Sequence, residues 1–215
     1  MTTSSGTLGL RFTKIDDLKR PDHFYLTAED ECFFLREYTA RAGFGHSETN
    51  DLIQNFKKSP DRKGLPEWYY KERDLRRIAL EFRQAMGEKW ISLWTLVPIP
   101  PSKCRTDPMY DDRLLRMLLE MTIGIRSDIR ELIHQTKSVA AAHESDDRPS
   151  PDEIERFYKV DEGVAEPTPK SIALVDDVLT TGSHFKAAKR VLSDRFPKAR
   201  IIGVFIARRV PEPLF

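Results

Sequence analysis

Two adjacent carboxylates end an apolar run in the stretch SIALVDDVLTTGSHFKAAKRVL, residues 171–192. Residues 171–175 have the length and composition of a strand that is buried on both faces, and an amphipathic helical pattern follows. In a parallel sheet, ligands collect at the carboxyl ends of the strands. Asp176 and Asp177 lie at such an end, so we expect both acids to face solvent and to accept hydrogen bonds from a ligand.

The turn after the two acids carries groups that bind anions. Thr180, Thr181 and Ser183 supply hydroxyls, and Gly182 lets the backbone approach a ligand closely. The helix that follows begins with free amides and the positive end of its dipole. A phosphorylated sugar fits both halves, with its phosphate on the amides and its ring hydroxyls on the acids. A plain strand–loop–helix crossover explains one acid and the glycine, but not the whole string.

The string IALVDDVLTTGS, residues 172–183, closely resembles the phosphoribosyl-pyrophosphate (PRPP) binding motif of type I phosphoribosyltransferases. The resemblance implies that Asp176 and Asp177 bind the ribose 2- and 3-hydroxyls and serve as the catalytic acids. It implies Mg²⁺ as cofactor, held by these two acids indirectly, through ribose hydroxyls or water. It also implies a loop around the 5-phosphate made of Thr180, Thr181, Gly182 and Ser183.

A second segment, LVPIPPSKCR at 96–105, resembles the VPVP strand end and basic loop of the ComF-like branch of this family. That loop contacts pyrophosphate in the family, which makes Ser102, Lys103 and Arg105 the matching candidates. The polar segment from Gln135 to Pro151 takes the place of the family's mobile catalytic loop, with Lys137 as a pyrophosphate contact. The alternatives are an ordinary proline-ended strand before basic residues and a solvated loop lysine.

The resemblance covers about residues 91–209 and departs from the family in two places. The chain lacks the N-terminal cysteine cluster of ComF-like proteins. Residue 184 is His where the family more often has Thr or another small residue. In the first helical turn His184 could touch the phosphate, but we expect it to face solvent. The loop GFGHSETN, residues 43–50, is either a base-selecting loop or a turn between two helices capped by Ser47.

The elements around these motifs predict an α/β protein. The apolar runs 171–175 and 199–207 flank a helical pattern, and the run 90–100 is a further strand. We expect a type I phosphoribosyltransferase-like parallel sheet flanked by helices, with an N-terminal helical cap. The spacing of Phe34, Leu35, Tyr38 and Ala42 predicts a helix after Thr27, and two more helical patterns follow.

The predicted organisation has three parts: a flexible arm at 1–21, a hood-like helical cap at 22–88 and a phosphoribosyltransferase-like core at 89–215. Lys and Arg number 35 against 34 Asp and Glu, which gives a net charge of +1 and does not indicate a broad nucleic-acid surface. Cys32 and Cys104 have no metal-ligand spacing. The sequence has no signal-peptide pattern and no run long enough to span a membrane. We therefore expect a cytoplasmic protein without membrane contact, and a homodimer is left open.

Three functions fit these patterns. The expected one is a glycosyltransferase of nucleotide metabolism that transfers a phosphoribosyl group to or from a nitrogenous acceptor, with Mg-pyrophosphate as leaving group. A regulator that senses PRPP or a nucleotide without turnover would keep the same motif. A nucleotide-linked or nucleic-acid-linked effector on the same fold is the third alternative.

Overall fold

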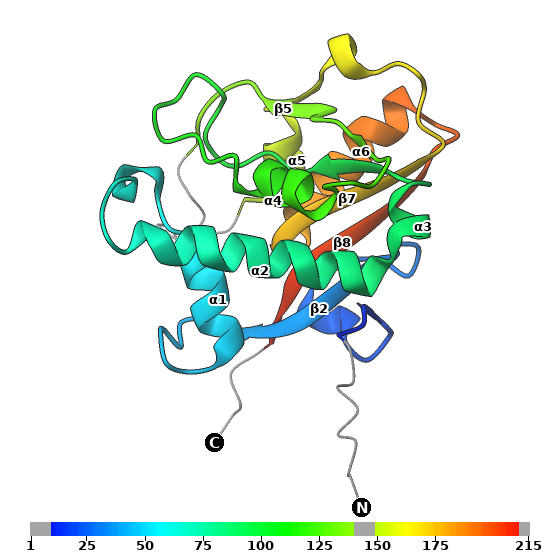
Figure 1. Ribbon diagram of the computed structural model, residues 1–215. Helices are drawn as coiled ribbons and strands as arrows, with labels where there is room; N and C mark the ends of the chain where they lie inside the picture. The colour runs from blue at the N-terminus through cyan, green and yellow to red at the C-terminus, as the bar shows by residue number, and fades with distance from the viewer. Residues whose placement is uncertain (1–9, 140–148, 211–215) are drawn as a thin grey trace, which may run out of the picture.

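The computed structural model describes residues 10–139 and 149–210, and its centre is a mostly parallel six-stranded sheet (Figure 1). The strand order is β1-β2-β8-β7-β3-β4, and β1 (Thr13–Lys14) is antiparallel to its neighbour β2. The parallel strands are β2 (Cys32–Thr39), β3 (Thr95–Pro98), β4 (Asp128–Ile129), β7 (Ser171–Leu179) and β8 (Arg200–Val210). A separate antiparallel pair joins β5 (Ile133–Gln135) to β6 (Tyr158–Val160). The predicted α/β class with a parallel sheet is confirmed.

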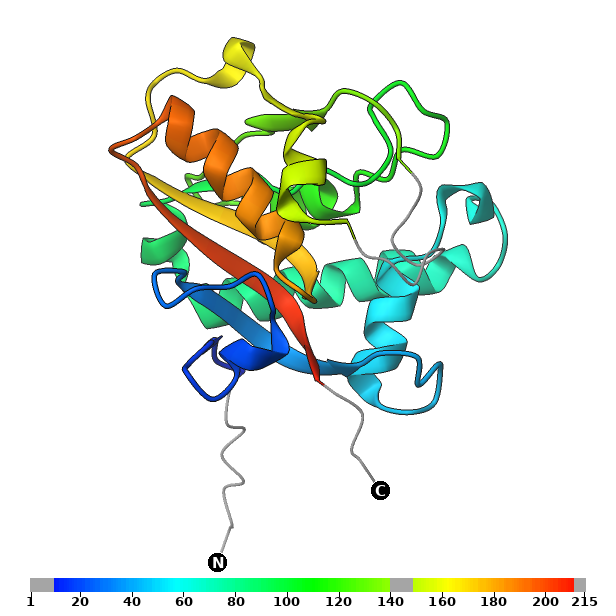
Figure 2. The same ribbon diagram turned by 180° about the vertical axis from the view of Figure 1, so that it is seen from behind.

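Helices cover both faces of this sheet (Figures 1 and 2). One face carries α1 (Glu48–Phe56), α2 (Trp68–Met86) and α4 (Arg113–Met121), with the short α3 (Glu88–Ile91) at the end of α2. The other face carries α6 (Ser183–Arg195), against which α5 (Pro151–Glu155) packs. Over residues 10–139 and 149–210 there are also three 3₁₀ turns: Arg20–Asp22, Pro60–Arg62 and Glu162–Val164.

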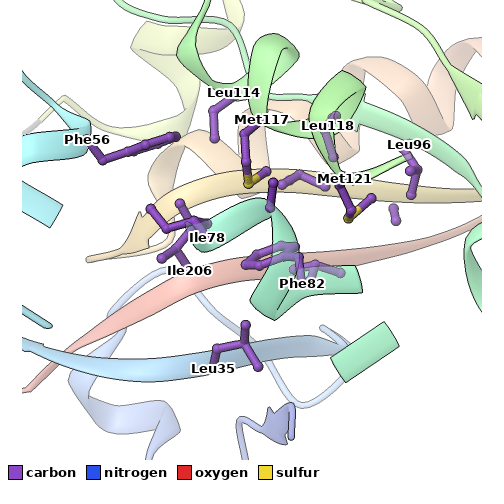
Figure 3. Packing of buried hydrophobic residues seen from close by; sticks show 14 of the residues in the cluster. Leu35, Phe56, Ile78, Phe82, Leu96, Leu114, Met117, Leu118, Met121 and Ile206 are labelled. Carbon is purple, nitrogen blue, oxygen red and sulfur yellow. The ribbon is translucent and has the colours of Figure 1, made fainter. Parts of the chain in front are cut away.

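Each central strand contributes to two apolar cores because its side chains alternate between the faces. In β7, Ala173 and Val175 pack in the core under α2 and α4, whereas Ile172 and Leu174 pack in the core under α6. Figure 3 shows the first core, where Phe82 lies among side chains from the sheet and from α4. The continuous apolar run before Asp176 is thus explained by burial on both faces.

The helix predicted after Thr27 is wrong, because residues 32–39 form strand β2. This strand pairs in parallel with β8 from Cys32↔Gly203 to Thr39↔Val210. Cys32 and Phe34 enter the core under α6, and Leu35 enters the opposite core. The apolar run CFFL is therefore a doubly buried strand, and the segment 22–88 is not all-helical.

The other elements follow the sequence more closely. The helices predicted after residues 47, 67 and 182 are confirmed as α1, α2 and α6, and the Ser47 hydroxyl caps α1 by accepting from the Asn50 amide at 3.1 Å. The segment 128–135 forms two short strands that belong to different sheets. Part of the predicted arm, β1, pairs with β2, and the division of the chain at residues 21 and 88 stays a prediction. Within the described residues, no helix is long and apolar enough to cross a membrane.

Candidate functional site

A cavity of about 510 Å³ lies at the carboxyl ends of β3 and β7. These strands are neighbours in the sheet, and the pairing continues past Pro98 because the Ile99 amide donates to the Val175 carbonyl at 2.9 Å. The segments that follow the two strands therefore meet at one edge. The predicted site residues that line this cavity are Asp176, Asp177, Thr180, Ser183, Ser102, Lys103 and Arg105.

Asp177 is buried and held by two cations from distant parts of the chain. Its Oδ1 lies 3.2 Å from Nζ of Lys57, just after α1, and its Oδ2 lies 2.5 Å from Nη2 of Arg113, the first residue of α4. Burial alone would raise the pKa of Asp177, but Lys57 and Arg113 outweigh burial and hold the pKa well below its usual range. Asp177 is therefore an ionised carboxylate fixed within an ion-pair network.

Asp176 differs from its neighbour in both contacts and charge. Its Oδ1 accepts a hydrogen bond from the Asp177 amide at 2.8 Å, and no described basic side chain forms an ion pair with it. Burial, followed by the negative charge of Asp177, raises the pKa of Asp176 well above its usual range. The expectation that both acids face solvent is thus wrong for Asp177, and Asp176 is the carboxyl open to a ligand.

The loop after β3 brings two basic side chains to the cavity, and Lys103 is near enough to Asp107 to help lower the pKa of that carboxyl. Arg105 pairs with Glu131 at 3.2 Å and with Asp161 at 3.1 Å, so its guanidinium is already neutralised by two carboxylates. Lys103 forms no ion pair with a described residue. The Ser102 carbonyl accepts from the Gln135 side chain at 2.9 Å, which ties this loop to β5. Of the basic candidates in this loop, Lys103 is the one free to meet an anion.

The back of the loop 180–183 packs against an N-terminal segment that the sequence did not indicate. The buried His23 places its Nδ1 2.5 Å from the Thr180 carbonyl, and the Tyr25 amide donates to the Thr181 carbonyl at 2.9 Å. Gly182 has φ of 85°, and a Cβ added there would lie 2.8 Å from a methyl carbon of Leu26. The left-handed conformation and the closeness of Leu26 therefore both favour glycine at position 182.

The front of the same loop presents free donors. In the described part of the chain, no group accepts a hydrogen bond from the amides of residues 181–184, which open α6. The Thr181 hydroxyl lies 3.3 Å from that of Ser183. Thr181 and Gly182 support this turn but are not among the residues that line the cavity.

Two further expectations concern the loops around the site. Lys137 is not among the described residues that line the cavity, and residues 140–148, most of the segment expected to close over a ligand, lie outside the described residues. Residues 43–47 lie in the connection between β2 and α1, and residues 48–50 form the first turn of α1. None of them is part of the described lining, so the turn interpretation fits, although the turn follows a strand.

His184 does not simply face solvent as predicted. It is half-buried, lines the cavity and places its Nδ1 2.9 Å from the hydroxyl of Tyr158 on β6. The sequence analysis also missed Lys57, Arg113 and His23. Arg113 belongs to the charged run DDR at 111–113, a local signal, whereas Lys57 and His23 stand in ordinary polar surroundings.

Compared with known proteins, the chain matches no protein-family model, and no curated protein matches it significantly. The fold and the site define an α/β protein with a cavity at the carboxyl edge of its sheet, lined by both acidic and basic side chains. The likeness to type I phosphoribosyltransferases rests on residues 96–105 and 172–183.

Proposed function

We propose that this protein binds PRPP, or a nucleotide in the reverse direction, and transfers the phosphoribosyl group between pyrophosphate and a nitrogenous acceptor. One observation carries the proposal: a single cavity is lined by the acid pair, by Thr180 and Ser183 of the turn 180–183, and by three polar residues of the loop 102–105. These three parts match the ribose, the 5-phosphate and the pyrophosphate of one ligand.

The anion-binding turn would hold the 5-phosphate. Free amides of residues 181–184 and the positive end of α6 favour a negative group there. The hydroxyls of Thr180 and Ser183, which line the cavity, add donors to the same place. Asp176 lies beside this turn and would accept hydrogen bonds from the ribose hydroxyls.

The chemical step would be a displacement at the anomeric carbon. A nitrogen of the acceptor forms the new bond, the bond to the pyrophosphate oxygen breaks, and its electron pair leaves with pyrophosphate. Positive charge develops on the sugar ring, and the carboxylate of Asp176 would stabilise it. Lys103, which also lines the cavity, would stabilise the charge that grows on the leaving group.

The residues present fit a magnesium ion that arrives with the ligand. Among the described residues no three acidic, His or Cys side chains are grouped to hold a metal. Asp177 already meets two cations, so Asp176 is left to hold Mg²⁺ through the ribose hydroxyls or water. When bound, Mg²⁺ supplies charge stabilisation for the departing pyrophosphate.

The test is pyrophosphate release from PRPP, measured with a panel of purine, pyrimidine and other nitrogenous acceptors. The proposal predicts release that depends on one acceptor class and on Mg²⁺. PRPP binding without release from any acceptor would replace the transferase with a sensor. Absence of PRPP and nucleotide binding would refute both.

A further inference from the structure

Tyr158 and His184 form a pair that the residues of the proposed reaction leave unexplained. Tyr158 is buried on β6, and its hydroxyl lies 2.9 Å from Nδ1 of His184 in the first turn of α6. The imidazole lines the cavity together with Thr180 and Ser183. Nε2 of His184 has no hydrogen-bond partner among the described residues.

The environment of the pair sets the direction of its hydrogen bond. In the described part of the chain, Nδ1 of His184 is the one partner of the Tyr158 hydroxyl, so the buried hydroxyl satisfies its proton only by donating to Nδ1. Burial raises the pKa of Tyr158 well above its usual value and lowers the pKa of His184 to about 4, so the phenol keeps its proton and the imidazole is neutral. A neutral imidazole that accepts at Nδ1 carries its proton on Nε2.

We propose that Tyr158 is a positioning residue that holds His184 as a neutral Nε2–H donor toward a phosphate group of the ligand. This inference rests on the proposed function, because the ligand is taken to be a phosphorylated ribose. The donor stands at the same turn as the free amides of residues 181–184, and it adds a directed hydrogen bond without adding a charge. We therefore expect His184 to increase the affinity for ribose 5-phosphate but not the affinity for ribose.

The first measurement examines the free protein. Nitrogen-15 shifts of His184 at pH 7 should show a neutral ring protonated at Nε2 in the wild type. Tyr158→Phe removes only the hydroxyl. It should shift the Nδ1 resonance toward the value of an imidazole nitrogen that accepts no hydrogen bond. A ring protonated at Nδ1, or a doubly protonated ring, would overturn the inference whatever the protein binds.

The second measurement is calorimetric binding of ribose 5-phosphate and of ribose. His184→Asn puts its amide nearer the place of Nδ1, whereas His184→Gln extends a donor toward the place of Nε2. We expect Tyr158→Phe and His184→Asn to weaken ribose 5-phosphate binding by about fivefold, the loss of one hydrogen bond, and His184→Gln to retain most of the affinity. Tyr69→Phe, on the exposed face of α2 outside this cavity, is the matched control and should bind as the wild type does.

The outcomes separate the two claims. Equal binding by wild type, Tyr158→Phe and His184→Asn would overturn the positioning role while the proposed function stands. Binding of neither ribose 5-phosphate nor PRPP by the wild type would overturn the proposed function, and with it the phosphate as the partner of His184.

Discussion

Arg113 and Asp177 stand 64 positions apart in the chain, yet Nη2 of Arg113 lies 2.5 Å from Oδ2 of Asp177. Arg113 also meets Asp111 at 2.9 Å, and Asp111 meets the fully buried Lys71 of α2 at 2.7 Å. The second acid of the pair is thereby joined through buried charges to the helices that cover the sheet. The two acids consequently have different roles, and substitutions should separate them.

Asp177→Asn should destabilise the fold, by about 3 kcal/mol, because it leaves Lys57 and Arg113 without their shared carboxylate in a buried place. Asp176→Asn should lower the free energy of unfolding by less, since no described cation pairs with Asp176. Urea unfolding of both variants measures the difference. Equal losses of stability would contradict the assignment of the ion pairs to Asp177 alone.

Stability should fall with rising pH through the contribution of Asp176. Burial and Asp177 raise the folded-state pKa of Asp176. At pH values between the ordinary and the raised pKa, the folded state therefore binds more protons than the unfolded state. The contribution is therefore favourable at low pH and is lost as pH rises. Unfolding free energies measured between about pH 5 and 8 should drop more in the wild type than in Asp176→Asn. If the free energy of unfolding changes with pH equally in the wild type and in Asp176→Asn, the raised pKa of Asp176 is contradicted.

Gly182→Ala should destabilise the protein and weaken phosphate binding. The substitution forces a left-handed backbone on alanine, which costs about 1–2 kcal/mol, and brings its Cβ against Leu26. Gly43→Ala is the matched control, because Gly43 has a φ of 75° and no atom within 4 Å of an added Cβ. Urea unfolding should show the larger loss at Gly182. If Gly43→Ala lowers the free energy of unfolding by as much, the contact with Leu26 does not contribute to the loss at Gly182.

Lys103→Ala should weaken PRPP binding by about tenfold, roughly 1.4 kcal/mol, and leave ribose 5-phosphate binding nearly unchanged. The reason is that Lys103 lines the cavity in the loop expected at the pyrophosphate and forms no ion pair with a described residue. Lys63→Ala, an exposed lysine outside the cavity lining, serves as control. Equal weakening for both ligands would place Lys103 elsewhere in the site.

Strand β2 shows what the sequence leaves undecided about the fold. Phe34, Leu35 and Tyr38 fall at helical spacing, but a short apolar run that is buried on both faces has no period of its own. This segment forms a strand because it pairs with β8, in which Phe205 lies opposite Phe34. The runs at 171–175 and 199–207 were predictable as strands because a clear helical pattern separates them.

The site residues likewise fall into those that the sequence could predict and those that it could not. Asp176, Thr180 and Ser183 were predictable because strand end, turn and helix start are local features of one segment. Lys57 and Arg113 were not, because their distance from Asp177 depends on how α1 and α4 pack on the sheet. Local sequence features indicate the edge of the sheet at which the cavity lies, and tertiary packing decides which of the two acids takes part in the ion pairs.

The most direct test of the central claim is calorimetric titration of PRPP with Mg²⁺ into the wild type and into Asp176→Asn. We predict saturable binding by the wild type and an affinity at least about tenfold lower in the variant, or 1.4 kcal/mol, with both proteins equally folded by circular dichroism. Binding that is absent from the wild type, or unchanged in Asp176→Asn, would contradict it.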